Sequence, residues 1–277
     1  MKFFAFADEA DNRLEGQIAA MRRNSLNGLE IRRVDGANVS EISTEKAYEI
    51  RERMADAGLT VWSIGSPIGK IDIEKDDFAA HLDKLKHTLE IANILDSQNI
   101  RMFSFYIPKG NDPEDYRGEV IDRLGTMLEI AKGTGIDLCH ENEKGIYGDI
   151  ATRCRKLHQT LPELKGVFDP ANFIQCEQDT WEAWQLLHSY IKYMHIKDAL
   201  PDGSVVPAGE GIGNLQRILA AFRAQGGMEV SVEPHLKVFE GLKGLEREGE
   251  KSIVSNFTYP SNDAAFDVAC NALRKIL

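Results

Sequence analysis

Short apolar segments alternate with longer amphipathic segments along the whole chain of 277 residues. The short segments have the length and the apolar content of buried strands. The eight predicted strands cover residues 3–7, 29–34, 59–65, 100–106, 136–141, 166–169, 193–197 and 228–233. Strict alternation of this kind is typical of an α/β protein with a parallel sheet, because each parallel strand needs a crossover connection before the next.

Apolar residues at helical spacing fill the intervals between these strands. The predicted helices cover residues 14–26, 44–57, 77–95, 113–131, 149–161, 180–190, 214–224 and 263–276, and the second begins at a capping pattern on Ser43 or Thr44. Eight strands and eight helices predict a single (β/α)8 TIM barrel over residues 1–277. The alternative, an open doubly wound sheet, would need a glycine-rich turn after its first strand, and residues 6–16 offer none.

The segment 237–262 lies between the last predicted strand and the last predicted helix. It is longer than a typical connection from a strand to a helix. One interpretation is a surface helix with a solvated run of charges. The other is an extended loop that forms a lid over the barrel mouth or a subunit contact, and a homo-oligomer is left open.

The net charge of −11 argues against a nucleic-acid partner, since such proteins usually carry a basic face. No stretch is apolar for long enough to cross a membrane, and the first residues lack the features of a signal peptide. The four cysteines form no C-x-x-C pair and are interpreted as reduced thiols: Cys139, Cys154, Cys176 and Cys270. These features together predict a cytoplasmic protein.

Four predicted strands of the second half end on residues that bind metals: Glu141, Asp169, His195 and Glu233. The carboxyl ends of the strands of a barrel lie at one face, so these side chains are expected to converge there. Three carboxylates together would repel one another without a cation. Oxygen ligands with one imidazole suit one divalent ion, with Mn²⁺ as the first expectation and Mg²⁺, Co²⁺ or Zn²⁺ as alternatives. Singly, Asp169 could instead cap a helix and His195 could be a core residue.

Other polar residues near the strand ends are candidates for substrate binding. Lys197 shares a face with His195 and would donate to a substrate oxygen, or else form a salt bridge with Asp198 or another acidic residue. Arg32 shares a face with Glu30, and the two predict a structural ion pair or an anchor for a substrate anion.

Two further segments have the composition of ligand-binding turns. Ser66 lies near the end of the third predicted strand and is a candidate substrate contact. Residues 209–214 form a glycine-rich turn before a helix, which could hold a phosphate, although Glu210 within it disfavours an anion.

The sequences HEN, FDPAN, HIKD and VEPH at these strand ends resemble the xylose isomerase-like TIM-barrel superfamily, broadly described as sugar phosphate isomerases and epimerases. The group includes ketose 3-epimerases, inosose isomerases and dehydratases, hydroxypyruvate isomerases and endonuclease IV. The resemblance implies that Glu141, Asp169, His195 and Glu233 hold the metal. It also implies that Glu141 and Glu233 are the catalytic residues, which exchange protons with the substrate.

The expected function is therefore a metal-dependent isomerase or epimerase of a small sugar, ketose, inosose or sugar acid, acting through an enediolate. Alternatives are a dehydratase of a keto-polyol, a sugar-binding barrel without catalysis, and a phosphodiesterase like endonuclease IV. The sequence departs from the ketose 3-epimerases where they contact the sugar: Asn172 replaces a His, Pro201 an Arg and Tyr147 a Glu. Asn172 is retained as a substrate-binding candidate, and a ketohexose substrate is in doubt.

Overall fold

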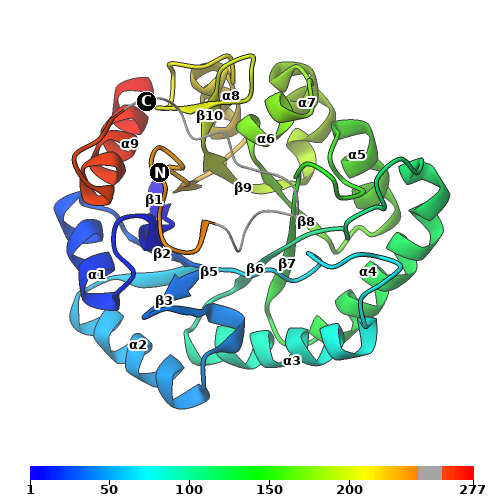
Figure 1. Ribbon diagram of the computed structural model, residues 1–277, viewed down its shortest axis with the longest axis horizontal. Helices are drawn as coiled ribbons and strands as arrows, with labels where there is room; N and C mark the ends of the chain where they lie inside the picture. The colour runs from blue at the N-terminus through cyan, green and yellow to red at the C-terminus, as the bar shows by residue number, and fades with distance from the viewer. Residues whose placement is uncertain (243–257) are drawn as a thin grey trace.

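The computed structural model describes residues 1–242 and 258–277. Eight parallel strands close into a barrel in the order β1-β12-β9-β8-β7-β6-β5-β2, with helices around it (Figure 1). The barrel strands are β1 (Lys2–Ala5), β2 (Gly28–Ile31), β5 (Thr60–Gly65), β6 (Asn99–Met102), β7 (Asp137–Glu141), β8 (Lys165–Phe168), β9 (Ile191–Ile196) and β12 (Glu229–Val232). The predicted (β/α)8 TIM barrel is confirmed.

The outer ring contains the predicted helices and one short helix that the sequence pattern did not indicate. They are α1 (Leu14–Arg23), α2 (Thr44–Asp56), α3 (Phe78–Ile94), α4 (Arg117–Ala131), α5 (Ala151–Thr160), α6 (Pro170–Gln175), α7 (Thr180–Leu187), α8 (Leu215–Ala224) and α9 (Asn262–Ile276). Ser43 caps α2 as predicted, because its side chain accepts a hydrogen bond from the backbone N–H of Lys46. The unexpected helix α6 begins directly after β8, where Asp169 caps it and Pro170 supplies its first residue.

Two strands, β2 and β6, end three or more residues earlier than the apolar pattern predicted. The predicted strand 29–34 stops at Ile31, and the chain continues into a small hairpin of β3 (Arg33–Val34) and β4 (Ala37–Asn38). Its turn is made by Asp35 and Gly36, which have φ angles of 49° and 86°. The predicted strand 100–106 stops at Met102, and Phe105 beyond it also has a positive φ of 64°. Because β2 and β6 end early, the residues that follow them form loops at the carboxyl face of the barrel.

The barrel interior contains a layer of side chains below the carboxyl face. Cys139, Val167 and Tyr193 form a separate buried cluster there. Because side chains alternate along a strand, the residues two positions later on β7, β8 and β9 point the same way. This alternation brings three of the predicted ligands to the carboxyl face, as the sequence suggested.

The ring closes where α9 lies beside α1, and Arg23 of α1 forms ion pairs with Asp263 and Asp267 of α9 (Figure 1). Most of the predicted extended loop 237–262 lies outside the described residues, so its interpretation as a lid or subunit contact stays a prediction. All four cysteines are free thiols. Within residues 1–242 and 258–277, no helix combines the length and the apolar character needed to cross a membrane.

Candidate metal centre and active site

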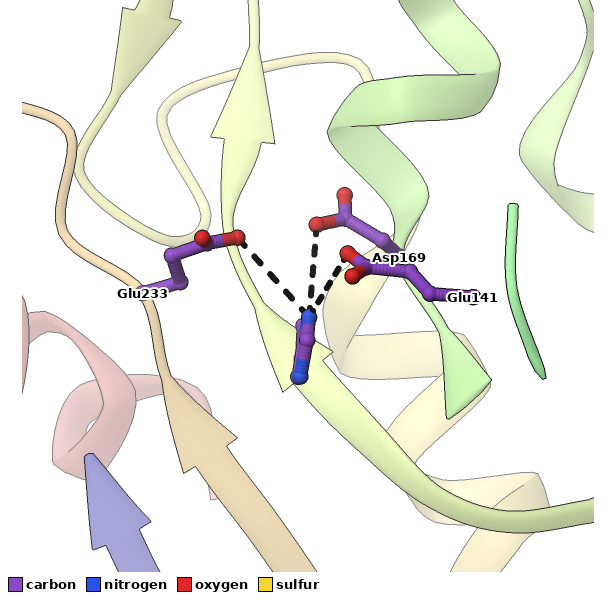
Figure 2. Close-up of side chains that lie close together, drawn as sticks. Glu141, Asp169 and Glu233 are labelled. Carbon is purple, nitrogen blue, oxygen red and sulfur yellow. Dashed lines mark hydrogen bonds and ion pairs between the residues drawn. The ribbon is translucent and has the colours of Figure 1, made fainter. Parts of the chain in front are cut away.

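The four predicted ligands lie together at the carboxyl face, and each is at most 4% exposed. Glu141 ends β7, His195 lies in β9, and Asp169 and Glu233 directly follow β8 and β12. One donor atom from each residue lies within 4.8 Å of the others. Figure 2 shows the three carboxylates facing a single imidazole nitrogen.

That nitrogen is Nδ1 of His195. It lies 2.9 Å from Glu141 Oε1, 3.7 Å from Asp169 Oδ2 and 3.8 Å from Glu233 Oε2. Asp169 uses its other oxygen, Oδ1, to cap α6 by accepting from the backbone N–H of Asn172 at 3.0 Å. The cap and the ligand therefore use different oxygens of Asp169, and the two interpretations of this residue are compatible.

A lysine bridges two of the four residues. Lys197 Nζ lies 2.8 Å from Asp169 Oδ2 and 2.7 Å from Glu233 Oε2, and the side chain is 7% exposed. Burial alone would lower the pKa of Lys197, but these two carboxylates outweigh it and raise the pKa above its ordinary value. Lys197 therefore stays protonated and points into the site. The alternative interpretation of Lys197, a salt bridge to an acidic residue, is therefore what the structure shows, although the partners are Asp169 and Glu233 and not Asp198.

Each of the two glutamates also contacts an arginine. Arg101 of β6 donates to Glu141 Oε2 at 3.1 Å, and Arg32 donates to Glu233 Oε1 at 3.0 Å. Both guanidinium groups lie over the ring of Phe6, at 5.1 Å and 4.6 Å from its centroid. Glu141 and Glu233 are thus each held by one arginine, Glu141 from β6 and Glu233 from the segment after β2.

These cations decide the ionisation of the two glutamates. Burial raises the pKa of Glu141, but His195 and Arg101 together bring it below its ordinary value. Burial likewise raises the pKa of Glu233, yet Lys197 and the neighbouring cations bring it well below. Both side chains are therefore carboxylates at neutral pH.

Arg32 does not pair with Glu30, the partner that the sequence suggested. It donates to Asp8 at 2.9 Å and to Glu9 at 3.0 Å, in addition to Glu233. The early end of β2 explains the difference, because Arg32 lies beyond the strand and turns towards the residues after β1. Its guanidinium already has three carboxylate partners. Its expected role as an anchor for a substrate anion stays a prediction.

The buried charges around the site are unbalanced. Six carboxylates surround it among the described residues: Asp8, Glu9, Glu30, Glu141, Asp169 and Glu233. Three permanent cations lie among them: Arg32, Arg101 and Lys197. Uncompensated buried carboxylates are costly, so a divalent cation would relieve the excess. Three carboxylate oxygens and one imidazole nitrogen also form a donor set that such ions accept, and the residues therefore fit one divalent metal.

The glycine-rich turn 209–214 holds a carboxylate of the protein itself. The backbone N–H groups of Gly209, Gly211 and Gly213 donate to Asp198 at 2.9, 3.1 and 2.9 Å. A Cβ on Gly211 would lie 2.3 Å from Asp198 Oδ1, so glycine is required for this close approach. The donors that could have bound a phosphate are already occupied, which argues against the phosphate site that the sequence suggested.

Ser66 and Asn172 are both buried, and each acts on a neighbouring residue. The hydroxyl of Ser66 donates to the backbone carbonyl of Arg101 at 2.6 Å and accepts from Ile68 N–H at 3.2 Å. Asn172 Nδ2 donates to Glu141 Oε1 at 3.3 Å and to the carbonyl of Asn142 at 2.9 Å. The structure therefore places Asn172 against a predicted ligand, and the substrate-binding roles of both residues stay predictions.

Some residues of the site were missed from the sequence, and Glu30 was given only a different partner, Arg32. Arg101, which was missed, lies inside β6 and is 3% exposed, and Glu30 lies inside β2 and is fully buried. The signal that could have found them is a charged residue within an apolar strand, which implies a buried partner. Asp8 and Glu9 follow β1 as Glu233 follows β12, and the same argument from strand ends applies to them.

Comparison with known proteins gives the same fold. The model of the family described as xylose isomerase-like TIM barrel matches residues 18–251. No curated protein sequence matches the chain. Among solved structures, the probable 3-DHS dehydratase AsbF from Bacillus anthracis is similar, with a TM-score of 0.75 and 17% identity over 99% of both chains.

Two further structures are similar over nearly the whole chain. The IolI protein, with a bound zinc atom, has a TM-score of 0.75 and 15% identity, covering 100% of this chain and 98% of its own. A D-psicose 3-epimerase from Clostridium cellulolyticum H10, solved with D-tagatose, has a TM-score of 0.74 and 16% identity, covering 100% and 99%. At such identities these likenesses show the fold alone. Because the family model spans most of the sequence, the chain belongs to the xylose isomerase-like TIM barrel family.

Proposed function

We propose that the protein is a divalent-metal-dependent isomerase or epimerase that acts on a small sugar, ketose, inosose or sugar acid through an enediolate. The observation that carries this proposal is the arrangement of Glu141 and Glu233. They come from β7 and β12, which are separated in the barrel by β8 and β9, and their oxygens approach His195 Nδ1 to 2.9 and 3.8 Å from these two separate strands. A flat intermediate between them would meet one carboxylate at each end.

A bound divalent ion would act as a Lewis acid on the substrate carbonyl and make the neighbouring C–H more acidic. The protein would supply the proton transfers. One of Glu141 and Glu233 accepts the proton from carbon. The other first takes up a proton from solvent or a substrate hydroxyl and then delivers it, to a different carbon in an isomerase or to the opposite face of the same carbon in an epimerase. Because cations hold the pKa of both glutamates low, each is a carboxylate at neutral pH, which is the form that a proton acceptor needs. The ammonium of Lys197 would donate to a substrate oxygen.

The comparisons support an uncharged or weakly charged substrate of this kind. The similar solved structures include a D-psicose 3-epimerase with D-tagatose and a 3-keto-D-glucoside 4-epimerase. The occupied glycine-rich turn around Asp198 favours a substrate without a phosphate at that place. A zinc atom in the similar IolI structure supports a metal in this family, and Mn²⁺ remains the first ion to test.

A dehydratase is the second candidate. It would share the removal of a proton next to a carbonyl, and then lose a hydroxyl group from the next carbon. Lys197 favours it, because its ammonium lies 2.7 Å from Glu233 Oε2 and can donate a hydrogen bond to a departing hydroxyl, which then takes up the proton that the glutamate removed from carbon. The probable dehydratase among the similar structures agrees with this reading.

The deciding experiment incubates the Mn²⁺-loaded protein in D₂O with ketoses, inososes and sugar acids and follows the substrates by NMR. Deuterium entering a carbon next to the carbonyl supports the isomerase or epimerase, even without net conversion. Loss of a hydroxyl-bearing carbon signal with a new unsaturated product supports the dehydratase. A sugar that binds and stays unlabelled over hours would contradict the proposal and support a sugar-binding barrel without catalysis. Cleavage of an abasic-site oligonucleotide would instead support a phosphodiesterase.

A further inference from the structure

Glu30 is a buried carboxylate that the proposed chemistry does not use. It lies inside β2 and has no exposed surface. Its partners are three uncharged or titratable groups: Tyr193 donates to Oε1 at 2.7 Å, Ser63 donates to Oε1 at 3.3 Å, and His195 Nε2 lies 3.1 Å from Oε2. Glu30 therefore differs from Glu141 and Glu233, which are each held by an arginine.

The two ring nitrogens of His195 face different groups. Nδ1 points to the three predicted ligand carboxylates, whereas Nε2 points down the barrel to Glu30. A metal held by His195 needs the lone pair of Nδ1, so the remaining ring proton must lie on Nε2. Oε2 of Glu30 is the acceptor in line with that proton. Metal-binding histidines commonly donate their second N–H to a carboxylate in this way, which fixes the tautomer and the ring orientation.

The other contacts of Glu30 keep its carboxylate from turning. Tyr193 and Ser63 both bind Oε1, and the two hydroxyl groups lie 3.1 Å from each other. Among the residues that the structure describes, Oε2 is then left for His195 alone. The ring of Phe6 packs edge-on against the imidazole at 5.2 Å between centroids and limits its rotation from the side.

We propose that Glu30 is a positioning residue that holds His195 with its proton on Nε2, so that Nδ1 is presented to a divalent metal between Glu141, Asp169 and Glu233. This inference rests on the metal site of the proposed function and does not depend on the substrate. It assigns to β2 a part in metal binding, although β2 supplies no ligand. Outer partners of this type typically contribute about 10–100-fold to metal affinity.

The test measures Mn²⁺ affinity by calorimetry, without any substrate. Glu30→Gln keeps the shape of the side chain and removes its charge, and it should weaken Mn²⁺ binding by about 10–100-fold. Glu30→Asp keeps the charge but withdraws the carboxylate from Nε2, so it should weaken binding as well and serves if the first variant does not fold. Ser63→Ala is the matched control, because it removes a contact to Glu30 without touching His195, and it should leave Mn²⁺ affinity unchanged.

A second measurement reads the ring itself. In the Zn²⁺-loaded parent, ¹⁵N NMR of His195 should show the proton on Nε2, and the Nε2 chemical shift should move in Glu30→Gln because its hydrogen-bond acceptor loses its charge. A purely structural role would lower the melting temperature of Glu30→Gln while leaving Mn²⁺ affinity and the Nε2 chemical shift as in the parent, which would overturn the proposal. A parent protein that binds no Mn²⁺ or Zn²⁺ would overturn it together with the metal site, whereas equal affinities of parent and variant would overturn it alone.

Discussion

The two halves of the barrel contribute different parts of the site. Strands β7, β8, β9 and β12 carry the four predicted ligands, and they are neighbours in the closed sheet (Figure 1). The supporting residues lie in or after β1, β2 and β6. Glu30, Arg32 and Arg101 contact the ligands, and Asp8 and Glu9 bind Arg32. The ligand half would bind the metal and exchange protons, and the supporting half sets its charge and orientation. Substitutions in the two halves should therefore change different measurable quantities.

The largest effect is expected in the ligand half, on turnover. Glu141→Gln and Glu233→Gln remove the groups that accept a proton, and each should reduce turnover by about 10²–10⁴-fold at saturating Mn²⁺. Hydrogen exchange with D₂O measures this directly. Glu229→Gln is the control, because Glu229 begins the same strand as Glu233 at the far end of the barrel. A metal-loaded Glu→Gln variant that exchanges hydrogen as fast as the parent would contradict the proton-transfer role.

In the supporting half the main effect should be on stability. Arg32→Met leaves three buried carboxylates without their common partner, which should lower the free energy of unfolding by about 3–5 kcal/mol. Arg101→Met leaves one buried carboxylate, Glu141, without its arginine partner, so it should lower the free energy of unfolding by less. Urea denaturation of the metal-free protein measures both. Arg23→Met, which breaks a partly exposed pair, should cost about 0–1 kcal/mol, and an Arg32→Met variant no less stable than this control would refute the expectation.

Outside the site, the stability of the protein is expected to depend on pH through one buried histidine of α3. His81 of α3 accepts a hydrogen bond from the backbone N–H of Gly69 at 2.8 Å, and burial lowers the pKa of His81 from 6.5 to about 4. The unfolded chain takes up this proton below pH 6.5 and the folded chain only near pH 4. Stability should therefore be full above pH 6.5 and fall by about 1–3 kcal/mol as the pH drops towards 4. His81→Gln cannot titrate, so its loss of stability in acid should be smaller; parallel pH profiles for parent and variant would exclude His81 as the cause.

The smallest effect is expected at Asn172, which the ligand half places against Glu141. Its amide cannot carry a proton between substrate atoms, so Asn172→Ala should raise KM more than it lowers kcat. If Asn172 makes one hydrogen bond to the substrate, its loss costs about 1 kcal/mol of binding free energy, which corresponds to roughly a fivefold rise in KM. Steady-state kinetics at saturating Mn²⁺ check this, with Gln175→Ala in the same helix as the control. A fall in kcat larger than the rise in KM would place Asn172 in the proton transfer instead.

The sequence predicted the barrel well because its signals are local and repeated. Each strand and helix carries its own apolar period, and capping residues such as Ser43 mark where helices begin. The errors lie where a turn conformation overrides the apolar run, as at Asp35 and Gly36 after β2. The short helix α6 was missed because six residues are too few to show a helical period.

The site was predicted only in its ligand half. Glu141, Asp169, His195 and Glu233 were found because similar residues recur at successive strand ends. Arg101 and Glu30 lie inside strands and not at strand ends, so they do not share the spacing of the ligands. The contacts of Glu30 with His195 and of Arg32 with Glu233 form only when the sheet closes into a barrel. Their partners were therefore not accessible from the order of residues, and Arg32 was assigned to Glu30 because alternation along an assumed longer strand placed the two together.

Phe6 links the supports of the two glutamates, although it is neither a predicted ligand nor a predicted catalytic residue. One fully buried ring lies under the guanidinium of Arg32 and under that of Arg101, and these groups hold Glu233 and Glu141. A change of the ring shifts both arginines at once. In related chains, substitutions at positions 6, 32 and 101 should therefore occur together. The residues at the strand ends should stay constant: Glu141, Asp169, His195 and Glu233.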